Sequence, residues 1–433
     1  MRILMSAFAC GPNRGSEDGV GWHWAVEAAK LGHEVVVLTQ TELRGEIEAK
    51  VASGRLPPRL RFEFFMPPWL DWLQRKGVAL SFEQLTWHLV HLIWQILACR
   101  YARTRLAAWR VEVVHHITFG GIRHPTLMGR LPLPLVLGPL GGGERAPFAL
   151  RRGFGWRAWL IDLVRDLHTW LIRFDPITRA ACADALVIYV KTAQSREVLP
   201  ARCHDKVDVR LEIGTREVAE MPRRDHRPGQ PLKLLFAGRF LYWKGTHLGL
   251  MALAELFRRG VEARLTMVGQ GPEEGVWRRL AADLGIDHTI DWQGWVPHDQ
   301  LGKLYCDHHA LLYPSLHDSS GNVVLESLSH GMPVVCLDLG GPAEMVDPSC
   351  GRVIATGGRS EAECAQALAD ALEELARSDD LLQRLSAGAR ARAQGCRWPV
   401  VVASLYDDVT RQLQRQSAHA PALASNRFQP RHL

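Results

Sequence analysis

The chain has 433 residues, of which 47% are hydrophobic, and it carries a formal net charge of +6. This length and composition allow two or three domains with sizeable cores and exclude a largely disordered chain. The mild positive charge suits phosphate-bearing ligands or anionic lipid, whereas nucleic acid is not an expected partner, because no Lys/Arg blocks are interleaved with aromatic residues. The nine cysteines include no CxxC pair, so neither a disulfide framework nor a zinc site is expected, and a reduced, cytoplasmic setting fits best.

The N-terminal stretch RILMSAF is a short apolar run, which suits a buried strand better than a signal peptide. No uninterrupted apolar run reaches the ~20 residues of a membrane span, and the nearest, residues 85–99, contains two histidines and a glutamine. A glycine-rich loop, a helix that ends at Gly32 and the buried strand HEVVVLT follow. This βαβ opening predicts a parallel, doubly wound sheet.

Four further strands are predicted in the first half of the chain: LRFEFF, VEVVHHITF, LPLVLG and ADALVIYV. Two helical segments rich in Trp and Arg, residues 82–109 and 155–174, interrupt the alternation and are predicted to be insertions on the first domain. Residues 214–231 are polar, charged and contain prolines, which is typical of a linker.

After the linker, the alternation of strands and helices restarts. The predicted strands are LKLLFAG, ARLTMVG, IDWQG, ALLYPS and PVVCLD, and the predicted helices lie at 246–259, 273–284, 298–305 and 322–330. The sequence therefore predicts an α/β protein with two doubly wound, Rossmann-like domains.

The domains are expected at residues 1–213 and 232–395. A last helix is predicted over residues 396–416, after a break that contains Pro and Gly. The tail, residues 417–433, is polar and lacks periodicity, so it is expected to be disordered.

In open parallel sheets, ligands bind at the carboxyl ends of the strands, so the loops at these ends are the candidate sites. The loop GPNRGSEDGVGW places Gly15 and Ser16 just before a helix, where backbone N–H groups and the helix dipole can hold an anion. A flexible loop without a ligand is the alternative. The loop FAGRFLYWKG places Arg239 and Lys244 after another strand, and two such cations suit the charge that accumulates when a phosphate leaves.

The stretch HDSSGNVVLESLSHGMPVV contains two acids, Asp318 and Glu326, around the start of a helix. Backbone N–H groups of Gly321 and Asn322 in the first turn can hold phosphate oxygens. Glu326, about one turn further on, and Asp318, in the loop, can then grip two other groups of the same ligand. A helix cap followed by a solvated glutamate explains the same spacing.

Histidines gather at the end of a first-domain strand, in VEVVHHITFGGIRHP. A histidine at such a place in a cleft can exchange protons or hydrogen-bond a sugar hydroxyl. His115 and His116 are adjacent and His124 is near, so at least one of them is a functional candidate, although a lone histidine is more often structural.

Together, FAGRFLYWKG, VGQGPEE, QGWVP, LLYPSLHDSSGNVVLESLSHGMPVV and LGGPAEMV resemble segments of the retaining glycosyltransferases of family four, which have the GT-B fold of two Rossmann-like domains facing across a cleft. The resemblance covers almost the whole chain and is most specific in the second domain. The first-domain stretches GSEDGVGW and GPLGGGE look like a bacterial subgroup linked to surface or secreted polysaccharides.

The resemblance implies a role for each second-domain candidate. Arg239 and Lys244 match the pair that binds the donor diphosphate and stabilises the leaving group. Glu326 matches the second acid of the family's E-x7-E motif, which binds the donor ribose, and Asp318 matches the first acid, which holds hydroxyls of the transferred sugar. The loop between the acids contacts sugar and phosphate through its backbone, and its matching residues are Ser320, Gly321, Asn322 and Val323.

The resemblance also covers sites outside this loop. Gly15 and Ser16 match the family's Gly-Gly loop beneath the phosphates, and Trp295 and Val296 fall where the family lines its nucleobase pocket. The family often ends a first-domain strand with His-x-His, the later histidine lying near the reacting sugar. This chain has two adjacent histidines instead, and the interpretation favours His116 as the catalytic one.

The expected reaction moves a hexosyl group from a UDP- or GDP-sugar to a saccharide acceptor in polysaccharide or glycolipid biosynthesis, with retention of anomeric configuration. No Asp-x-Asp motif stands in a convincing place, so no metal and no cofactor are expected. Asp318 is one methylene shorter than the family's glutamate, which leaves the transferred sugar open. The alternatives are a nucleotide-sugar epimerase, against which the cations and the two acids argue, and a non-catalytic GT-B scaffold subunit, which Asp318 favours.

The two insertions have the composition of helices at a membrane surface. Segment 82–109 has Trp87, Trp94 and Trp109 beside Arg100, Arg103, Arg105 and Arg110, and segment 155–174 has Arg157, Arg165 and Arg173 on one helical face. One apolar helical face in the second segment consists of Trp156, Trp159, Leu160, Leu163, Val164, Leu167, Trp170 and Leu171. Packing of the same stripe on a sheet is the alternative. We expect peripheral contact with the anionic inner face of the cell membrane, which suits a lipid-linked saccharide acceptor.

Overall fold

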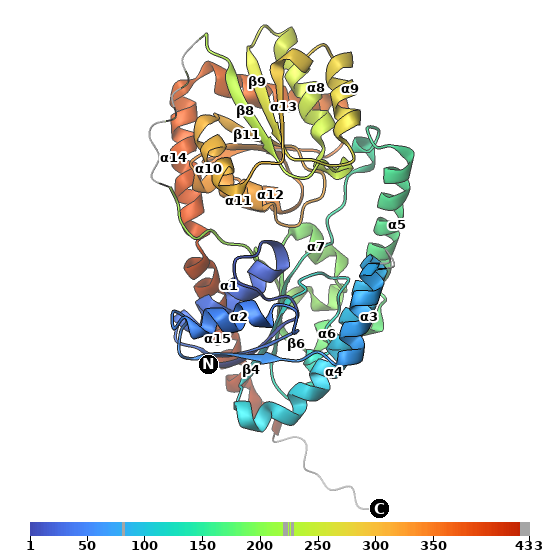
Figure 1. Cartoon of the computed structure of the whole chain (residues 1–433), viewed down its shortest axis with the longest axis vertical. Helices are drawn as coiled ribbons and strands as arrows, with labels where there is room; N and C mark the ends of the chain where they lie inside the picture. The colour runs from blue at the N-terminus through green and yellow to red at the C-terminus, as the bar shows by residue number, and fades with distance from the viewer. Residues whose placement is uncertain (80–82, 220–223, 225, 227–228, 425–433) are drawn as a thin grey trace, which may run out of the picture.

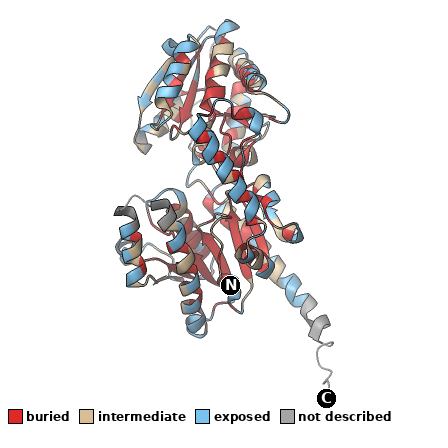
Figure 2. Ribbon diagram, turned by 90° about the vertical axis from the view of Figure 1, so that its right-hand side faces the viewer, coloured by how far each residue is buried: buried red, intermediate tan, exposed pale blue. Residues whose placement is uncertain are grey.

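The computed structural model describes residues 1–79, 83–219, 224, 226 and 229–424. Within these ranges the chain forms two α/β domains, each built around one parallel sheet (Figure 1). The strands of both sheets are largely buried, and helices with one exposed face surround them (Figure 2). None of the described helices combines the length and the apolar character that crossing a bilayer requires.

The first domain contains seven parallel strands in the order β3-β2-β1-β4-β5-β6-β7. Six of them coincide with the strands predicted from apolar runs, and the seventh, β7, has three residues, too few to carry a pattern. Their bounds are β1 (Arg2–Ala7), β2 (Glu34–Thr39), β3 (Leu60–Phe64), β4 (Val113–Thr118), β5 (Leu135–Leu140), β6 (Ala185–Val190) and β7 (Val207–Val209).

Seven α-helices accompany this sheet in the described part of the domain. The two predicted insertions are α4 and α5. The bounds are α1 (Ser16–Lys30), α2 (Arg44–Ala52), α3 (Pro68–Ala79), α4 (Glu83–Trp109), α5 (Trp156–Ile172), α6 (Pro176–Asp184) and α7 (Ala193–Val198).

The second domain contains six parallel strands in the order β10-β9-β8-β11-β12-β13. Their bounds are β8 (Leu232–Ala237), β9 (Ala263–Val268), β10 (Ile290–Gly294), β11 (Ala310–Tyr313), β12 (Val334–Leu337) and β13 (Gly351–Ile354). The helices are α8 (Thr246–Arg258), α9 (Glu274–Asp283), α10 (His298–Asp307), α11 (Asn322–Ser329), α12 (Gly340–Met345), α13 (Glu361–Arg377) and α14 (Asp379–Gly395). The four helices predicted after the linker are α8 to α11.

The last helix, α15 (Trp398–Ala424), returns from the second domain to the first (Figure 1). Its Tyr406 hydroxyl lies 2.8 Å from His115 Nδ1, and its Asp408 accepts a hydrogen bond from Tyr189 at 2.7 Å. The helix runs past its predicted end at residue 416 to Ala424, and the expected disorder of the tail stays a prediction. Residues 425–433 lie outside the described part.

Helix α4 packs its tryptophans into the first domain. Trp94 is fully buried and donates its indole N–H to the Phe65 carbonyl at 2.7 Å, and Trp109 is also buried. The expectation that these two side chains face a membrane is therefore wrong, because α4 covers the sheet and supplies part of its core.

Unlike α4, helix α5 buries its polar face and exposes its apolar face. Its buried residues include Asp162, Asp166 and Thr169, whereas its apolar face is exposed to solvent. Arg151, fully buried just before the helix, lies 3.0 Å from Asp162 and 2.5 Å from Asp166. A guanidinium beneath the helix thus allows two carboxylates to be buried, and the apolar stripe does not pack on a sheet as core.

Candidate active site

In each sheet the strand order reverses at one point, between β1 and β4 in the first domain and between β8 and β11 in the second. The carboxyl ends of the strands beside such a reversal form the ligand crevice of doubly wound folds. Lys244 and Asp318 follow β8 and β11, and Ser16 and Gly120 follow β1 and β4. In each domain, the loops after the two strands at the reversal therefore lie side by side.

Lys244 and Asp318 form an ion pair. Lys244 Nζ lies 2.6 Å from Asp318 Oδ2 and donates to the Tyr313 hydroxyl at 2.6 Å. The same Oδ2 accepts hydrogen bonds from Tyr313 at 2.6 Å and from Ser315 at 2.9 Å. Burial raises the pKa of Asp318, but Lys244 and these hydrogen bonds outweigh it, so the pKa lies below its ordinary value. The ionised carboxylate fixes the ammonium group in the crevice.

These contacts bear on the role expected of Asp318. Three donors from the second domain occupy Oδ2, so this oxygen holds Lys244 in position. Contact with hydroxyls of a transferred sugar stays a prediction, and it would fall to the other carboxylate oxygen.

Glu326 lies on α11, half-buried, and accepts a hydrogen bond from the buried Tyr305 hydroxyl at 2.8 Å. The helix begins after Gly321, whose φ of 81° favours glycine. The following residue, Asn322, is exposed, and Val323 is half-buried. The two acids of the motif are therefore held by tyrosines of the same domain, and their roles toward a donor stay predictions.

Three other second-domain candidates are not tied into this network. Arg239 is exposed, and its guanidinium forms no ion pair with the residues that the structure describes. Trp295 and Val296 follow β10 at the edge of the sheet, and Trp295 is 71% exposed while Val296 packs against the core. These side chains are available to a ligand, and their roles stay predictions.

The loop that carries Asp318 reaches the first domain. Ser319 donates to Glu144 at 2.6 Å, Ser320 donates to Glu212, and His317 Nε2 lies 3.1 Å from Asp162 of α5. The carboxyl ends of the strands of the two sheets therefore face each other at this loop.

The carboxylate of Glu144 accepts the hydrogen bond from Ser319 together with three others. It accepts hydrogen bonds from the Gly142 N–H at 2.9 Å, from Ser195 at 2.7 Å and from Thr192 at 2.8 Å, in addition to Ser319. Burial raises the pKa of Glu144, but the hydrogen bonds outweigh it and the pKa is lowered. Glu144 is thus an ionised anchor for the second domain.

Gly15 and Ser16 form the exposed start of α1, and a Cβ built on Gly15 would meet no atom within 4 Å. The next residue, Glu17, accepts a hydrogen bond from the Gly120 N–H at 3.1 Å and lies 3.6 Å from Lys191 Nζ. The loops after β1, β4 and β6 are thereby joined at the crevice.

Lys191 is buried directly after β6, 2.8 Å from Glu212. Burial lowers the pKa of Lys191, but Glu212 and Glu17 outweigh this and the pKa is raised. Because Ser320 also donates to Glu212, this buried charge pair touches the second domain.

The choice of His116 as the catalytic histidine stays a prediction. Its side chain is fully buried, with Nδ1 3.3 Å from Ser6 Oγ, and burial lowers its pKa to about 3. His115 is buried as well and lies 2.7 Å from the Gly138 carbonyl. Neighbouring residues of a strand point to opposite faces of the sheet, so both rings lie between sheet and helices. His124 lines the crevice instead.

Sequence reasoning missed Glu17, Glu144 and Lys191. Glu17 follows Ser16 in the quoted stretch GSEDGVGW, and Glu144 ends GPLGGGE. Lys191 is a cation placed directly after the apolar strand ALVIYV. A polar residue at the carboxyl end of each buried strand was the signal available.

Comparison with known proteins agrees with this geometry. Residues 218–392 match the family model described as glycosyl transferases group 1. The D-inositol 3-phosphate glycosyltransferase of Frankia alni is 35% identical over 195 residues, which cover 40% of this chain and 46% of that protein. The 2-deoxystreptamine glucosyltransferase of Streptomyces kanamyceticus is 27% identical over 230 residues, 52% of this chain and 58% of that protein. The matched segment thus spans about half the length of these relatives.

Two solved structures match over nearly the whole chain. The Anabaena protein HepE in complex with UDP has a TM-score of 0.57 at 13% identity and covers 95% of this chain and 100% of its own. The lipopolysaccharide outer core galactosyltransferase WaaB has a TM-score of 0.60 at 12% identity, with coverage of 95% and 100%. Residues 218–392, in the linker and the second domain, are thus similar to the glycosyl transferases group 1, and the chain as a whole has the GT-B fold.

Proposed function

We propose that the chain is a retaining glycosyltransferase that moves a hexosyl group from a UDP- or GDP-sugar to a lipid-linked saccharide acceptor. The observation that carries this proposal is the Lys244–Asp318 pair at the strand reversal of the second sheet, beside the loop that touches the first domain. A donor diphosphate in this crevice would meet the Lys244 ammonium, the exposed Arg239 and the start of α11.

The chemistry follows from these charges. Cleavage of the sugar–phosphate bond leaves negative charge on a nucleoside diphosphate, and cations and N–H groups that are already in place stabilise that charge most in the transition state. Lys244 is held by two partners before any ligand arrives, so little reorganisation is needed. The contacts of Ser319 and Ser320 with the first domain would help to exclude water from the reacting bond.

A donor screen tests the proposal. The protein is incubated with an extract of bacterial glycolipids and with UDP-glucose, UDP-galactose, UDP-N-acetylglucosamine or GDP-mannose in turn, and release of UDP or GDP is followed. UDP-sugars come first, because the similar fold of HepE holds UDP. We expect release with at least one donor and a product that keeps the anomeric configuration by NMR.

The Arg239→Ala/Lys244→Ala double variant controls for background hydrolysis, and Arg279→Ala/Lys303→Ala, which changes exposed cations of the same domain, is the matched control. Release that survives in the first variant would contradict the proposed site. Absence of release with every donor would favour a non-catalytic GT-B subunit, and an epimerised donor sugar would favour an epimerase.

We also propose that the exposed apolar face of α5 lies on an anionic membrane. Trp156 is 74% exposed, and Trp159, Leu160 and Leu167 are exposed beside it. Arg152 and Arg157 are exposed at the start of the helix, with the Arg157 guanidinium 5.2 Å from the centre of the Trp156 ring. Apolar side chains flanked by arginines suit the boundary between lipid tails and anionic head groups.

Vesicle flotation tests this face. The Trp156→Ser/Trp159→Ser variant is expected to bind vesicles of phosphatidylcholine and phosphatidylglycerol at least about 10-fold more weakly than the unchanged protein, because it loses much of the apolar area that enters the bilayer. Trp295→Ser removes an equally exposed tryptophan of the second domain and should bind like the unchanged protein. Equal binding of all three proteins would contradict the proposal.

A further inference from the structure

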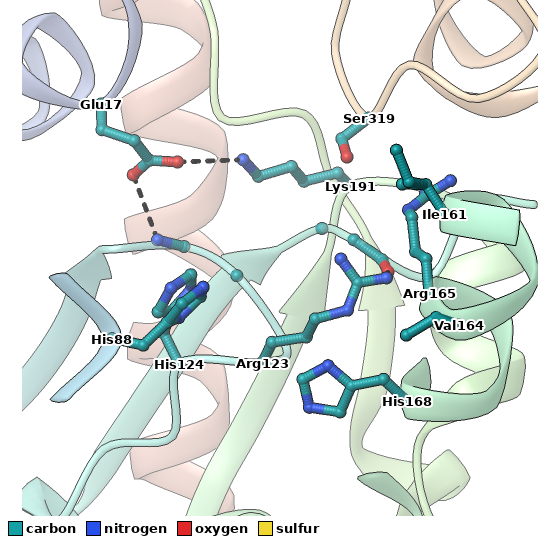
Figure 3. A pocket seen from close by; sticks show the side chains of 14 residues that line it. Glu17, His88, Arg123, His124, Ile161, Val164, Arg165, His168, Lys191 and Ser319 are labelled. Atoms are coloured by element: carbon teal, nitrogen blue, oxygen red, sulfur yellow. Dashed lines mark hydrogen bonds and ion pairs between the residues drawn. The ribbon is translucent and has the colours of Figure 1, made fainter. Parts of the chain in front are cut away.

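A cavity of about 430 Å³ lies on the first-domain side of the crevice. It opens at the carboxyl ends of β4, β5 and β6, and Ser319 of the second domain lines it as well. Figure 3 shows its side chains, which come from α1, α4, α5 and the loops after β4, β6 and β11. The volume suits a small molecule or the head of a larger one. Because Lys244 and Asp318 belong to the other domain, the cavity lies on the side of an acceptor.

The charges in the cavity are mainly positive. Arg123, Arg165 and Lys191 line it together with one carboxylate, that of Glu17. Glu17 lies 3.6 Å from Lys191, and Glu212 lies 2.8 Å from it, so carboxylates balance Lys191. The other two cations that line the cavity are Arg123 and Arg165.

Arg123 has neutral partners. Its Nη2 donates to the Gly142 carbonyl at 3.0 Å and to the Thr169 hydroxyl at 2.5 Å. Its Nε is buried without a hydrogen-bond partner, and within the described residues it forms no ion pair. Burial and then the charge of Arg165 lower the pKa of Arg123 to about 10, although Glu144, Asp166 and Asp162 act in the opposite direction. A half-buried guanidinium that no carboxylate pairs directly among the described residues is suited to an anionic ligand.

Arg165 approaches from α5. Its Nη2 donates to the Glu144 carbonyl at 2.6 Å, and its Nη1 lies 3.4 Å from Asp162. Asp162 also lies 3.0 Å from Arg151 and 3.1 Å from His317 Nε2, so its charge is shared between two guanidinium groups and a histidine contact. Figure 3 shows that Arg123 and Arg165 point toward the same part of the cavity.

Three histidines complete the polar wall. His88, His124 and His168 line the cavity, and burial together with the nearby Arg123 lowers the pKa of each. They are therefore neutral near pH 7 and can donate hydrogen bonds to an anion without adding charge.

The rim of the cavity is apolar. Ile161 and Val164 of α5 line it and are 58% and 59% exposed, and they adjoin the apolar face that we place on a membrane. A molecule with an anionic head and an apolar chain would thus find a cationic floor and an apolar path leading out of it.

We propose that this cavity binds a phosphate or diphosphate group of the acceptor, through Arg123 and Arg165. This inference rests on the proposed function, since it names the acceptor's chemistry. The phosphate can come from a lipid-linked saccharide or from a soluble sugar phosphate, and the apolar rim favours the lipid.

Direct binding tests the cavity without requiring sugar transfer. Calorimetry with farnesyl diphosphate, farnesol and glycerol 3-phosphate is done in the presence of saturating UDP and GDP, which occupy the donor crevice. We expect farnesyl diphosphate to bind and farnesol to bind at least about 10-fold more weakly. Equal binding of farnesol would overturn the proposal. Glycerol 3-phosphate binding as tightly as farnesyl diphosphate would uphold phosphate recognition and identify a soluble acceptor.

Variants locate the bound phosphate. Arg123→Gln and Arg165→Gln should each weaken binding of farnesyl diphosphate about 10- to 100-fold, because each removes a charge-assisted hydrogen bond. Arg123→Lys should restore part of the affinity, and Arg130→Gln, an exposed first-domain change, should have no effect. If Arg239→Ala/Lys244→Ala lost binding of farnesyl diphosphate while Arg123→Gln bound it like the unchanged protein, the diphosphate would lie in the donor crevice. That result would overturn the proposal. Failure of nucleotide release in the donor screen, with binding intact, would reject the proposed function alone.

Discussion

Replacing Lys244 with alanine is expected to lower the rate of sugar transfer about 10²- to 10³-fold, the usual effect of removing one preorganised donor to a developing negative charge. The structure gives the reason, since the ammonium is fixed 2.6 Å from both Asp318 and Tyr313 at the mouth of the second sheet. The loss should fall mainly on kcat, because the charge on the diphosphate grows as the bond breaks. Initial rates of nucleotide release over a range of donor concentrations measure it.

Two further variants sharpen this result. Lys303→Ala removes an exposed lysine of the same domain and should leave kcat unchanged. Asp318→Asn keeps a side chain of similar shape but removes the charge that holds Lys244, so its kcat should lie between those of Lys244→Ala and the unchanged protein. A kcat for Lys244→Ala within about threefold of the unchanged value would be too small for a leaving-group contact.

Replacing Arg151 with methionine is expected to lower the free energy of unfolding of the first domain by about 3–5 kcal/mol, the usual cost of leaving buried charges without their partner. Arg151 is enclosed beneath α5 and faces Asp162 and Asp166 at 3.0 and 2.5 Å. Burial raises the pKa of Asp162, but His317, Arg151 and Arg165 outweigh it and the pKa is lowered, so this buried carboxylate is charged near pH 7 and loses one of its partners in the variant. Urea unfolding followed by circular dichroism measures the change in the first-domain transition.

Arg157→Met, at an exposed position of α5, should unfold like the unchanged protein. Adding Asp162→Asn and Asp166→Asn to Arg151→Met should recover part of the lost stability, because neutral amides are less costly to bury than unpaired carboxylates. If Arg151→Met and Arg157→Met had the same unfolding midpoint, the buried ion pairs would not attach the helix.

Local patterns were sufficient for much of the fold. Apolar runs bounded by glycine-containing loops predicted all strands except β7 and β13, and the loops that follow β8 and β11 were identified as candidate sites. Such predictions succeed because a parallel strand buried on both faces must be apolar along its length, and this property is visible within a few residues. The end of the last helix at Ala424 was not predictable, because residues 417–424 lack an amphipathic pattern.

Only part of the candidate site could be predicted from local sequence patterns. Lys244, Asp318 and Glu326 each lie in recognisable stretches, but nothing local indicated that Asp318 would be taken up by Lys244 and Tyr313. The burial of the two histidines was not predictable, because a sequence shows that His115 and His116 are adjacent but not which layers enclose them. Arg123 and Arg165 were not predicted as a pair, since they come from a loop and from an inserted helix.

By itself, the sequence determined two doubly wound domains, the loops at the ends of their strands and an apolar stripe along residues 155–174, because these features depend on residue types within one or two turns or strands. Only the tertiary structure decided that the stripe faces solvent, that Ser319 meets Glu144 and that two arginines share one cavity. The physical reason is that an amphipathic helix buries whichever face finds partners, and here Arg151 offers its charge to the polar face. Partners of this kind come from distant segments, which are brought together only when the sheets and helices have packed.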